Sequence, residues 1–337
     1  MRRDGDALSA EKRLSVITSA FRTAPNIRAC CESILELTNL DEVESVLVMN
    51  EPDEIEQAIV EEFREAYPDV FTVIGLTERE SIGASINRGI RAARGEFCAL
   101  LDADDVRVAD SFAREIATLD ADDQVDFTYG DFIIVPSQGS QDGQRVVTPE
   151  FNREEFTRSC VASPTQLFRK SMVDRVGGFD EQFCSGGDYE FQIRAAMSCG
   201  FRRTEGVMCY YTRAGGSASA TRMQPLERTA IELRYGLYDK IVELEGYQFV
   251  DEAREYRLDA VLSNGEWHPI DQYVPGYAEL LAGRAALLEA MEARRARWTR
   301  WRPLTSRWEP VSSLGQRIAR RLGSSGAPAG EKGSSDA

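Results

Sequence analysis

Three aspartates at the end of one strand are the residues of this chain best suited to chemistry. Asp102, Asp104 and Asp105 follow residues 97–101, five apolar residues that predict a buried strand. Carboxylates this close repel one another and resist ionising together unless a cation lies between them. Their clustering therefore needs an explanation, and three can be weighed.

The first explanation, a calcium loop of the EF-hand type, fails. Such a loop needs an oxygen ligand at its fifth position and glycine at its sixth, where Val106 and Arg107 stand. The second is a solvated turn, the usual outcome for an isolated Asp-x-Asp-Asp. The third is a Mg²⁺ or Mn²⁺ site, in which phosphate oxygens of a substrate complete the coordination. A divalent cation would neutralise repulsion that a bare turn leaves uncompensated.

The elements before this turn alternate between strand and helix. Apolar runs predict strands at 13–21, 43–49, 70–76 and 97–101, and helical spacing predicts helices at 26–37, 52–67 and 81–94. Such alternation is typical of an α/β fold with a mainly parallel sheet and helices on both faces. Ligands of such sheets bind at the carboxyl ends of the strands, where the aspartates lie.

Beyond residue 107 the pattern changes. We expect a helix at 110–119, a strand at 125–135, a hairpin or loop at 136–144, a helix from Asp188 and a strand at 201–211. Residues 226–300 are predicted to be largely helical. The expected organisation is a flexible leader at 1–12, a catalytic domain at 13–220, a helical C-terminal region at 221–322 and a disordered Gly/Ser/Pro-rich tail at 323–337.

Composition excludes several classes of protein. The 337-residue chain has a net charge of −16, which argues against nucleic acid as a partner. Its one histidine, His268, is expected in a loop, so a His-based metal site or triad is nearly excluded. Seven cysteines without a CxxC pattern indicate small buried hydrophobes in a reducing compartment. No membrane span or secretory signal is apparent, so we expect a cytoplasmic protein.

A series of motifs in one order resembles the family 2 glycosyltransferases, inverting enzymes with the GT-A (Rossmann-like) fold. SIGASINRGIRAARGEFCALLDADD resembles the helix–strand–DxD module of that family. SVITSAFR resembles its first strand, FTYGDF the strand after the module, and FRKSMVDRVGGFDEQFCSGGDYEFQIR its acceptor-side segment. The resemblance covers about residues 13–220 and implies a mixed, mainly parallel sheet.

The resemblance also implies a division of labour. Asp102 and Asp104 would bind Mn²⁺ or Mg²⁺ and, through it, the diphosphate of a nucleotide-sugar, with Asp105 as a helper. Asp188 would be the base that deprotonates an acceptor hydroxyl. A helix start would keep Asp188 ionised, and a plain helix N-cap is the alternative role. Further candidates for binding the nucleotide-sugar are Ser19, Ala20, Phe21, Glu51, Asn87, Ala103 and Arg213.

Three places depart from the family pattern. Asn50 and Glu51 stand where the family usually has two aspartates, which leaves the base of the nucleotide open. Gly187 precedes Asp188 in place of the glutamate that many members carry. Ala214 stands where many members have histidine, so other groups would have to hold the diphosphate.

Residues 284–321 form an Arg- and Trp-rich segment, with ten arginines against three glutamates. This composition fits a peripheral contact with anionic lipid at the inner face of the cell membrane. It fits equally well a helix packed on the catalytic domain or on another subunit of a homo-oligomer. Both interpretations stay open.

The leading hypothesis is a metal-dependent inverting glycosyltransferase that moves a sugar from a nucleotide-diphospho-sugar to a hydroxyl of a glycan, a lipid-linked sugar or a small molecule. A sugar-nucleotide nucleotidyltransferase is less favoured, because no Gly-rich loop follows the first strand. The departures leave a third hypothesis, a degenerate GT-A protein that binds a glycan or a partner without catalysis. Intact Asp102, Asp104 and Asp188 argue against it.

Overall fold

The structure is a computed structural model that describes residues 11–213, 223–243 and 246–280, and the isolated positions 282, 289, 290 and 293. The chain divides into two compact units, residues 1–284 and 285–337, and the architecture below belongs to the first. Ala214, the tail at 323–337 and nearly all of the Arg- and Trp-rich segment lie outside the described residues.

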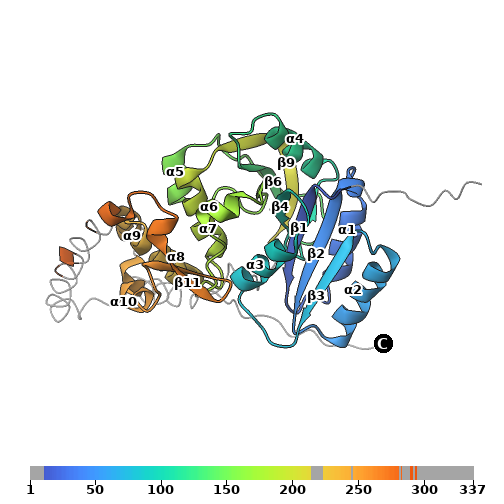
Figure 1. Cartoon of the computed structure of the whole chain (residues 1–337), viewed down its shortest axis with the longest axis horizontal. Helices are drawn as coiled ribbons and strands as arrows, with labels where there is room; N and C mark the ends of the chain where they lie inside the picture. The colour runs from blue at the N-terminus through green and yellow to red at the C-terminus, as the bar shows by residue number, and fades with distance from the viewer. Residues whose placement is uncertain are drawn as a thin grey trace, which may run out of the picture. The chain divides into compact units, whose positions relative to one another are not determined.

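A nine-stranded mixed sheet forms the centre of the first unit (Figure 1). Its parallel half has the order β3-β2-β1-β4, made of β1 (Leu14–Ala20), β2 (Val43–Asn50), β3 (Phe71–Leu76) and β4 (Phe97–Leu100). The sheet continues through β8 (Leu167–Arg169), β6 (Phe127–Val135), β9 (Phe201–Thr212) and β5 (Val106–Arg107), and β7 (Gln144–Val146) pairs with β6. The predicted α/β fold and its parallel N-terminal half are confirmed.

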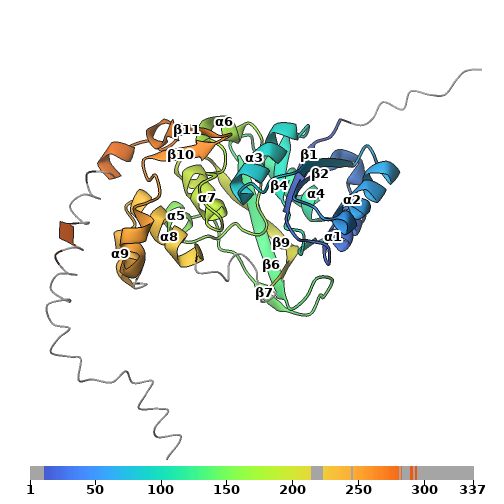
Figure 2. The ribbon, with the colours of Figure 1, turned by 90° about the horizontal axis from the view of Figure 1, so that it is seen from below.

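Helices cover both faces of the parallel half and bury its strands β1, β2 and β4 almost completely. On one face lie α1 (Ile27–Leu35) and α2 (Glu54–Ala66), which bury Ile34 and Phe63 in the same core cluster as Leu47. On the other face α3 (Ile82–Ala92) buries Ile86 in the cluster that contains Val48 (Figures 1 and 2). Neighbouring positions of β2 thus serve opposite cores, as strand geometry requires.

The second half of the unit adds α4 (Ser111–Asp120), α5 (Arg153–Arg158), α6 (Met172–Val176) and α7 (Gly187–Ser198). The helix predicted from Asp188 begins one residue earlier. The predicted strands at 125–135 and 201–211 correspond to β6 and β9. Residues 136–143 connect the antiparallel pair β6 and β7, so the hairpin or loop predicted at 136–144 is a hairpin connection.

The C-terminal part of the unit begins with α8 (Met223–Arg234), α9 (Tyr238–Glu243), a 3₁₀ turn (Gly246–Phe249) and α10 (Val250–Ala253). The expectation that 226–300 is largely helical is wrong at β10 (Ala260–Ser263) and β11 (Glu266–Pro269), which form a hairpin. Asn264 and Gly265 both have positive φ, 56° and 76°, as a two-residue hairpin turn requires. None of the described helices is long and apolar enough to cross a membrane.

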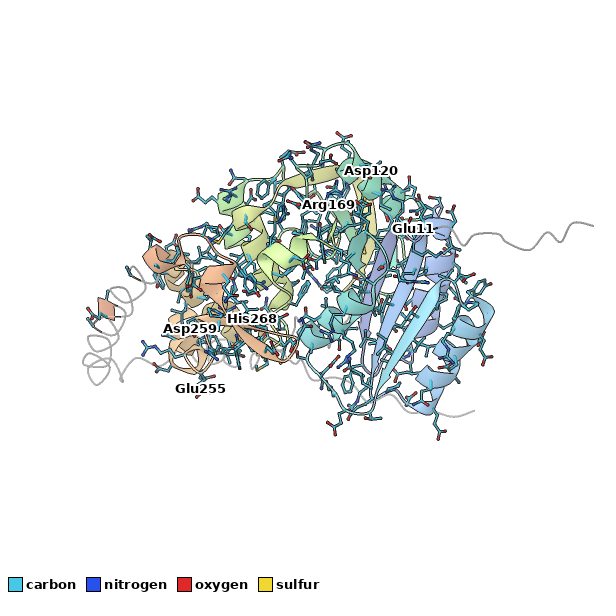
Figure 3. All side chains as sticks on the ribbon, in the orientation of Figure 1. Glu11, Asp120, Arg169, Glu255, Asp259 and His268 are labelled. Atoms are coloured by element: carbon cyan, nitrogen blue, oxygen red, sulfur yellow. The ribbon has the colours of Figure 1, made fainter. Side chains whose placement is uncertain are left out.

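His268 lies on this hairpin instead of in the expected loop (Figure 3). It is opposite Val261 in the strand pairing, and its ring centroid is 6.2 Å from that of Tyr273. His268 is therefore a strand residue of β11 that takes part in the hairpin pairing.

Four fully buried charged side chains join α7 and α8 to the loop that follows α6. Arg194 binds Glu190 with 2.6 Å between Nη2 and Oε2. Arg234 Nη1 lies 2.9 Å from Glu190 Oε1 and 2.8 Å from Asp180 Oδ2. Burial opposes ionisation of the carboxyl groups of both Glu190 and Asp180. At Glu190 the charges of Arg194 and Arg234 outweigh burial and lower the pKa. At Asp180 only Arg234 is paired with the carboxylate, and the pKa remains raised. Arg194 and Asp180, which belong to the acceptor-side segment of the motif series, therefore form ion pairs inside the core.

Candidate active site

The acidic turn after β4 is held from two sides. Within it, the backbone N–H of Asp105 donates to the carbonyl of Asp102 at 3.1 Å. Thr212, at the end of β9, donates its hydroxyl to the carbonyl of Asp104 at 2.6 Å. Gln138 donates its side-chain amide to the carbonyl of Ala103 at 2.9 Å. The carboxylates of this turn are therefore presented by a backbone that is held by β9 and by the connection between β6 and β7.

Asp105 is buried, unlike its two neighbours, and its Oδ1 accepts the backbone N–H of Thr212 at 2.8 Å. Loss of hydration, with the charge of Asp102 added, raises the pKa of Asp105 to about 9. The side chain is thus a protonated brace between β9 and the turn. The role of Asp105 as a helper to the metal ligands stays a prediction.

Replacement of Asp105 by asparagine is expected to stabilise the folded chain more as pH rises. A carboxyl group whose pKa is higher in the folded than in the unfolded chain costs stability between the two values, here from about 4 to about 9. Asparagine keeps the acceptor for Thr212 without that cost. Thermal unfolding in a chelator at pH 5 and pH 8 would measure the difference, with Asp123→Asn as control because Asp123 is 98% exposed. A gain over wild type that is equal at both pH values would contradict the protonated state.

Asp102 and Asp104 open toward the site. Asp102 is solvent-exposed, yet the surrounding protein removes part of its hydration, and with the charges of Asp104 and Asp188 this raises its pKa to about 6. Loss of hydration also raises the pKa of Asp104, which is half-buried. Asp188 thus acts electrostatically on Asp102, although the two residues are more than 80 positions apart in the sequence.

Asp188 lies in the first turn of α7, where Gly186 is the N-cap, so the alternative role of Asp188 as N-cap does not apply. Its Oδ1 accepts the N–H of Tyr189 at 2.8 Å, and the thiol of Cys160 donates to Oδ2 at 3.6 Å. Loss of hydration outweighs these bonds and raises the pKa of Asp188. The helix start therefore does not hold the pKa of Asp188 below its usual range, and its expected ionised state stays a prediction. A raised pKa suits a group that must take up a proton.

Residues at the ends of β1 and β2 line the neighbouring part of the site. Ser19 is partly exposed, whereas the side chain of Ala20 is buried in the core, so only the backbone of Ala20 could meet a ligand. Glu51 is exposed and has a positive φ of 45°; Arg22 likewise has a φ of 56°. Such conformations cost energy for residues other than glycine and cluster at functional sites.

Phe21 carries a cationic partner that sequence analysis missed. The guanidinium of Arg79, from the segment between β3 and α3, lies 3.9 Å from the centroid of the Phe21 ring, and that of Arg22 lies 5.0 Å away. Arg79 also acts electrostatically on the thiol of Cys184, just before α7. An aromatic ring and an exposed arginine at the strand ends could stack on a nucleotide base or meet a phosphate. Arg79 lies between two elements, so it belongs to no helical or strand periodicity that could have marked it as a candidate.

Asn87 has a different setting. Its Oδ1 accepts the N–H of Phe179 and its Nδ2 donates to the carbonyl of the same residue, both at 2.8 Å. Nδ2 also lies 2.8 Å from Glu181 Oε1 and 3.3 Å from Ser263 Oγ. The amide thus braces α3 against the loop after α6 and the β10–β11 hairpin. Direct contact with a nucleotide-sugar would require breaking these bonds.

The remaining candidates lie at the edge of the site. Arg213 is exposed and follows Thr212, so it begins beside the acidic turn. Gly187 is partly exposed, and nothing in the described structure lies within 4 Å of the position a Cβ would take. The place where many family members carry glutamate is therefore open space in this chain.

The donor set of Asp102 and Asp104 fits a hard divalent cation that takes further ligands from a diphosphate. Within the described ranges, no three His, Cys, Asp or Glu side chains are grouped so as to hold a metal ion by themselves. Two carboxylates, both with a pKa raised first of all by loss of hydration, provide the negative charge that a cation would neutralise. Their role as metal ligands stays a prediction.

The architecture is the GT-A fold. The crystal structure of Staphylococcus aureus TarS 1–349 in complex with UDP-GlcNAc aligns with a TM-score of 0.56 and 20% sequence identity, covering 72% of this chain and 71% of that one. Residues 15–176 match the family model Glycosyl transferase family 2. Through this segment, just under half of the chain, the protein is similar to family 2 of the glycosyltransferases.

Proteins of two other organisms are similar in sequence to part of this chain. Glycosyltransferase AglE of Haloferax volcanii is 27% identical over 186 residues, which span 54% of this chain and 60% of AglE. EpsH of Bacillus subtilis is 36% identical over 92 residues, which span 27% of this chain and 26% of EpsH. The matched residues thus cover less than two thirds of either relative.

Proposed function

We propose that this protein transfers a sugar from a nucleotide-diphospho-sugar to an acceptor hydroxyl, with inversion at the anomeric carbon, in the synthesis of a polysaccharide, glycolipid or other glycan. The observation that carries the proposal is that Asp102, on the turn after β4, and Asp188, on α7, lie near enough for the charge of Asp188 to add to the rise in the pKa of Asp102 that loss of hydration causes. Two acidic groups with distinct partners meet at the carboxyl ends of the strands, where ligands of such sheets bind. The similarity to family 2 supports the same reaction.

The two groups have separate tasks. Asp102 and Asp104 would hold Mn²⁺ or Mg²⁺, which when bound supplies positive charge to the departing nucleoside diphosphate. Asp188 accepts the proton of the acceptor hydroxyl at its carboxylate. The oxygen so freed forms the new bond to the anomeric carbon from the side opposite the bond to the diphosphate, which breaks, and the configuration inverts. Phe21, Arg79, Glu51 and Arg213 would bind the nucleotide.

A donor screen tests this function. UDP- and GDP-sugars are supplied with Mn²⁺, Mg²⁺ or a chelator, and release of nucleoside diphosphate is measured. We expect release with at least one donor, lost in the chelator and reduced about 100-fold or more in Asp104→Ala, because a cation contributes several kcal/mol to the transition state. Asp123→Asn, an exposed carboxyl outside the site, is the control. Failure of every donor to bind or react would refute the proposal.

A further inference from the structure

Glu227, on α8, makes a set of contacts that neither the fold nor the proposed reaction has used. The side chain is fully buried. Its Oε1 accepts the backbone N–H of Cys184 at 2.7 Å, and its Oε2 accepts those of Ser185 and Gly186 at 2.7 and 2.8 Å. The hydroxyl of Ser185 donates to Oε2 as well, at 3.0 Å. Three consecutive backbone N–H groups thus converge on one carboxylate.

These contacts lie directly before the catalytic base. Gly186 is the N-cap of α7 and has no side chain with which to cap it, and Asp188 follows two residues later. The loop also fits closely against α8, because a Cβ at Gly186 would lie 2.8 Å from Cδ1 of Ile231. A loop with two adjacent glycines has much conformational freedom. Glu227 and Ile231 remove that freedom where α7 begins.

We propose that Glu227 is a positioning residue for Asp188, and that α8 is therefore part of the active site. Both α8 and this loop lie outside the segment matched to the family, residues 15–176. Glu227 fixes the path of residues 184–186, which in turn fixes the first turn of α7 and the direction of the Asp188 carboxylate. The inference rests on the proposed function, since it assigns Asp188 as the base.

The hydrogen bonds that Glu227 accepts determine which variants test its role. Gln in place of Glu227 keeps the size of the side chain, but its NH₂ group would face backbone N–H groups that need an acceptor. Asp keeps the charge with a shorter reach. Glu232→Gln is the matched control, because Glu232 is also buried on α8 but its carboxylate pairs with Arg228 instead of the backbone of residues 184–186.

In Glu227→Gln we expect kcat for transfer to fall about 10- to 100-fold, because a small displacement of a catalytic group has effects of that size. The KM for the donor should stay nearly unchanged, since the turn that carries Asp102 and Asp104 follows β4 and is held by β9 and the β6–β7 connection. Amide hydrogen exchange of the peptide containing residues 184–189 should accelerate. Glu227→Asp should recover part of kcat, and Glu232→Gln should match wild type in all three measurements.

The inference is overturned if Glu227→Gln retains the kcat of the wild-type chain, or if kcat falls without faster exchange at 184–189. It is also overturned if kcat and donor KM change together in Glu227→Gln and Glu227→Asp, as general loss of structure would cause. A wild-type chain that releases no nucleoside diphosphate with any donor refutes the proposed function, and this inference with it. Unchanged kcat in Glu227→Gln beside an active wild type refutes the positioning role alone.

Discussion

Asp188→Asn should lower the rate of sugar transfer by about 10²- to 10⁴-fold, the range that a general base contributes. Asparagine keeps the size of the side chain and an acceptor for the N–H of Tyr189, so α7 should begin as in the wild-type chain. The donor should still bind, because its proposed ligands lie on other segments. Steady-state transfer rates beside equilibrium binding of the donor measure the two effects separately.

The pH dependence of the wild-type rate gives an independent check on Asp188. Its pKa is raised, mainly by loss of hydration, so activity should fall as pH decreases through a value above that of an ordinary aspartate. Cys160→Ala is the matched control, because the thiol donates to the same carboxylate and favours its ionised form. The Cys160→Ala variant should remain active, and as pH decreases its transfer rate should begin to fall at a higher pH than that of the wild-type chain. An Asp188→Asn chain as fast as wild type would show that the base lies elsewhere.

Arg234→Ala should reduce the free energy of unfolding by about 3–5 kcal/mol, the usual cost of leaving buried charges unpaired. Arg234 is the common partner of Asp180 and Glu190, and all three side chains are fully buried. The loss should be smaller at acid pH, where protonation of the two carboxyl groups removes the unpaired charge. Urea denaturation at neutral and acid pH measures both effects.

Arg228→Ala is the control for this loss of stability. Arg228 lies on the same helix and pairs with Glu232 four residues later, but its side chain is 35% exposed. Partly exposed pairs contribute about 1 kcal/mol or less. If Arg234→Ala cost no more than Arg228→Ala, the buried ion pairs would not be what joins α8 to the catalytic region.

The alternation of strands and helices up to Asp105 was predictable, because it depends on local features. Burial of a strand on both faces produces an apolar run, and a helix with one buried face produces a spacing of three to four residues. The Asn264–Gly265 turn was equally local, and it was a signal for a hairpin that the expectation of a helical region overlooked. Helices, strands and turns could thus be predicted from the sequence where the residues that determine them lie within about ten positions of one another.

Sequence alone determined which residues are acidic, where the parallel strands end, and the order of motifs that resembles family 2 of the glycosyltransferases. Tertiary structure decided what each acid does. Asp102 remains open to the site while Asp105 is buried against Thr212, 107 residues away. Glu227 reaches the loop before Asp188 from a helix some 40 residues further on. Hydration and charge depend on which groups meet in space, and distant partners leave no periodic trace in the chain.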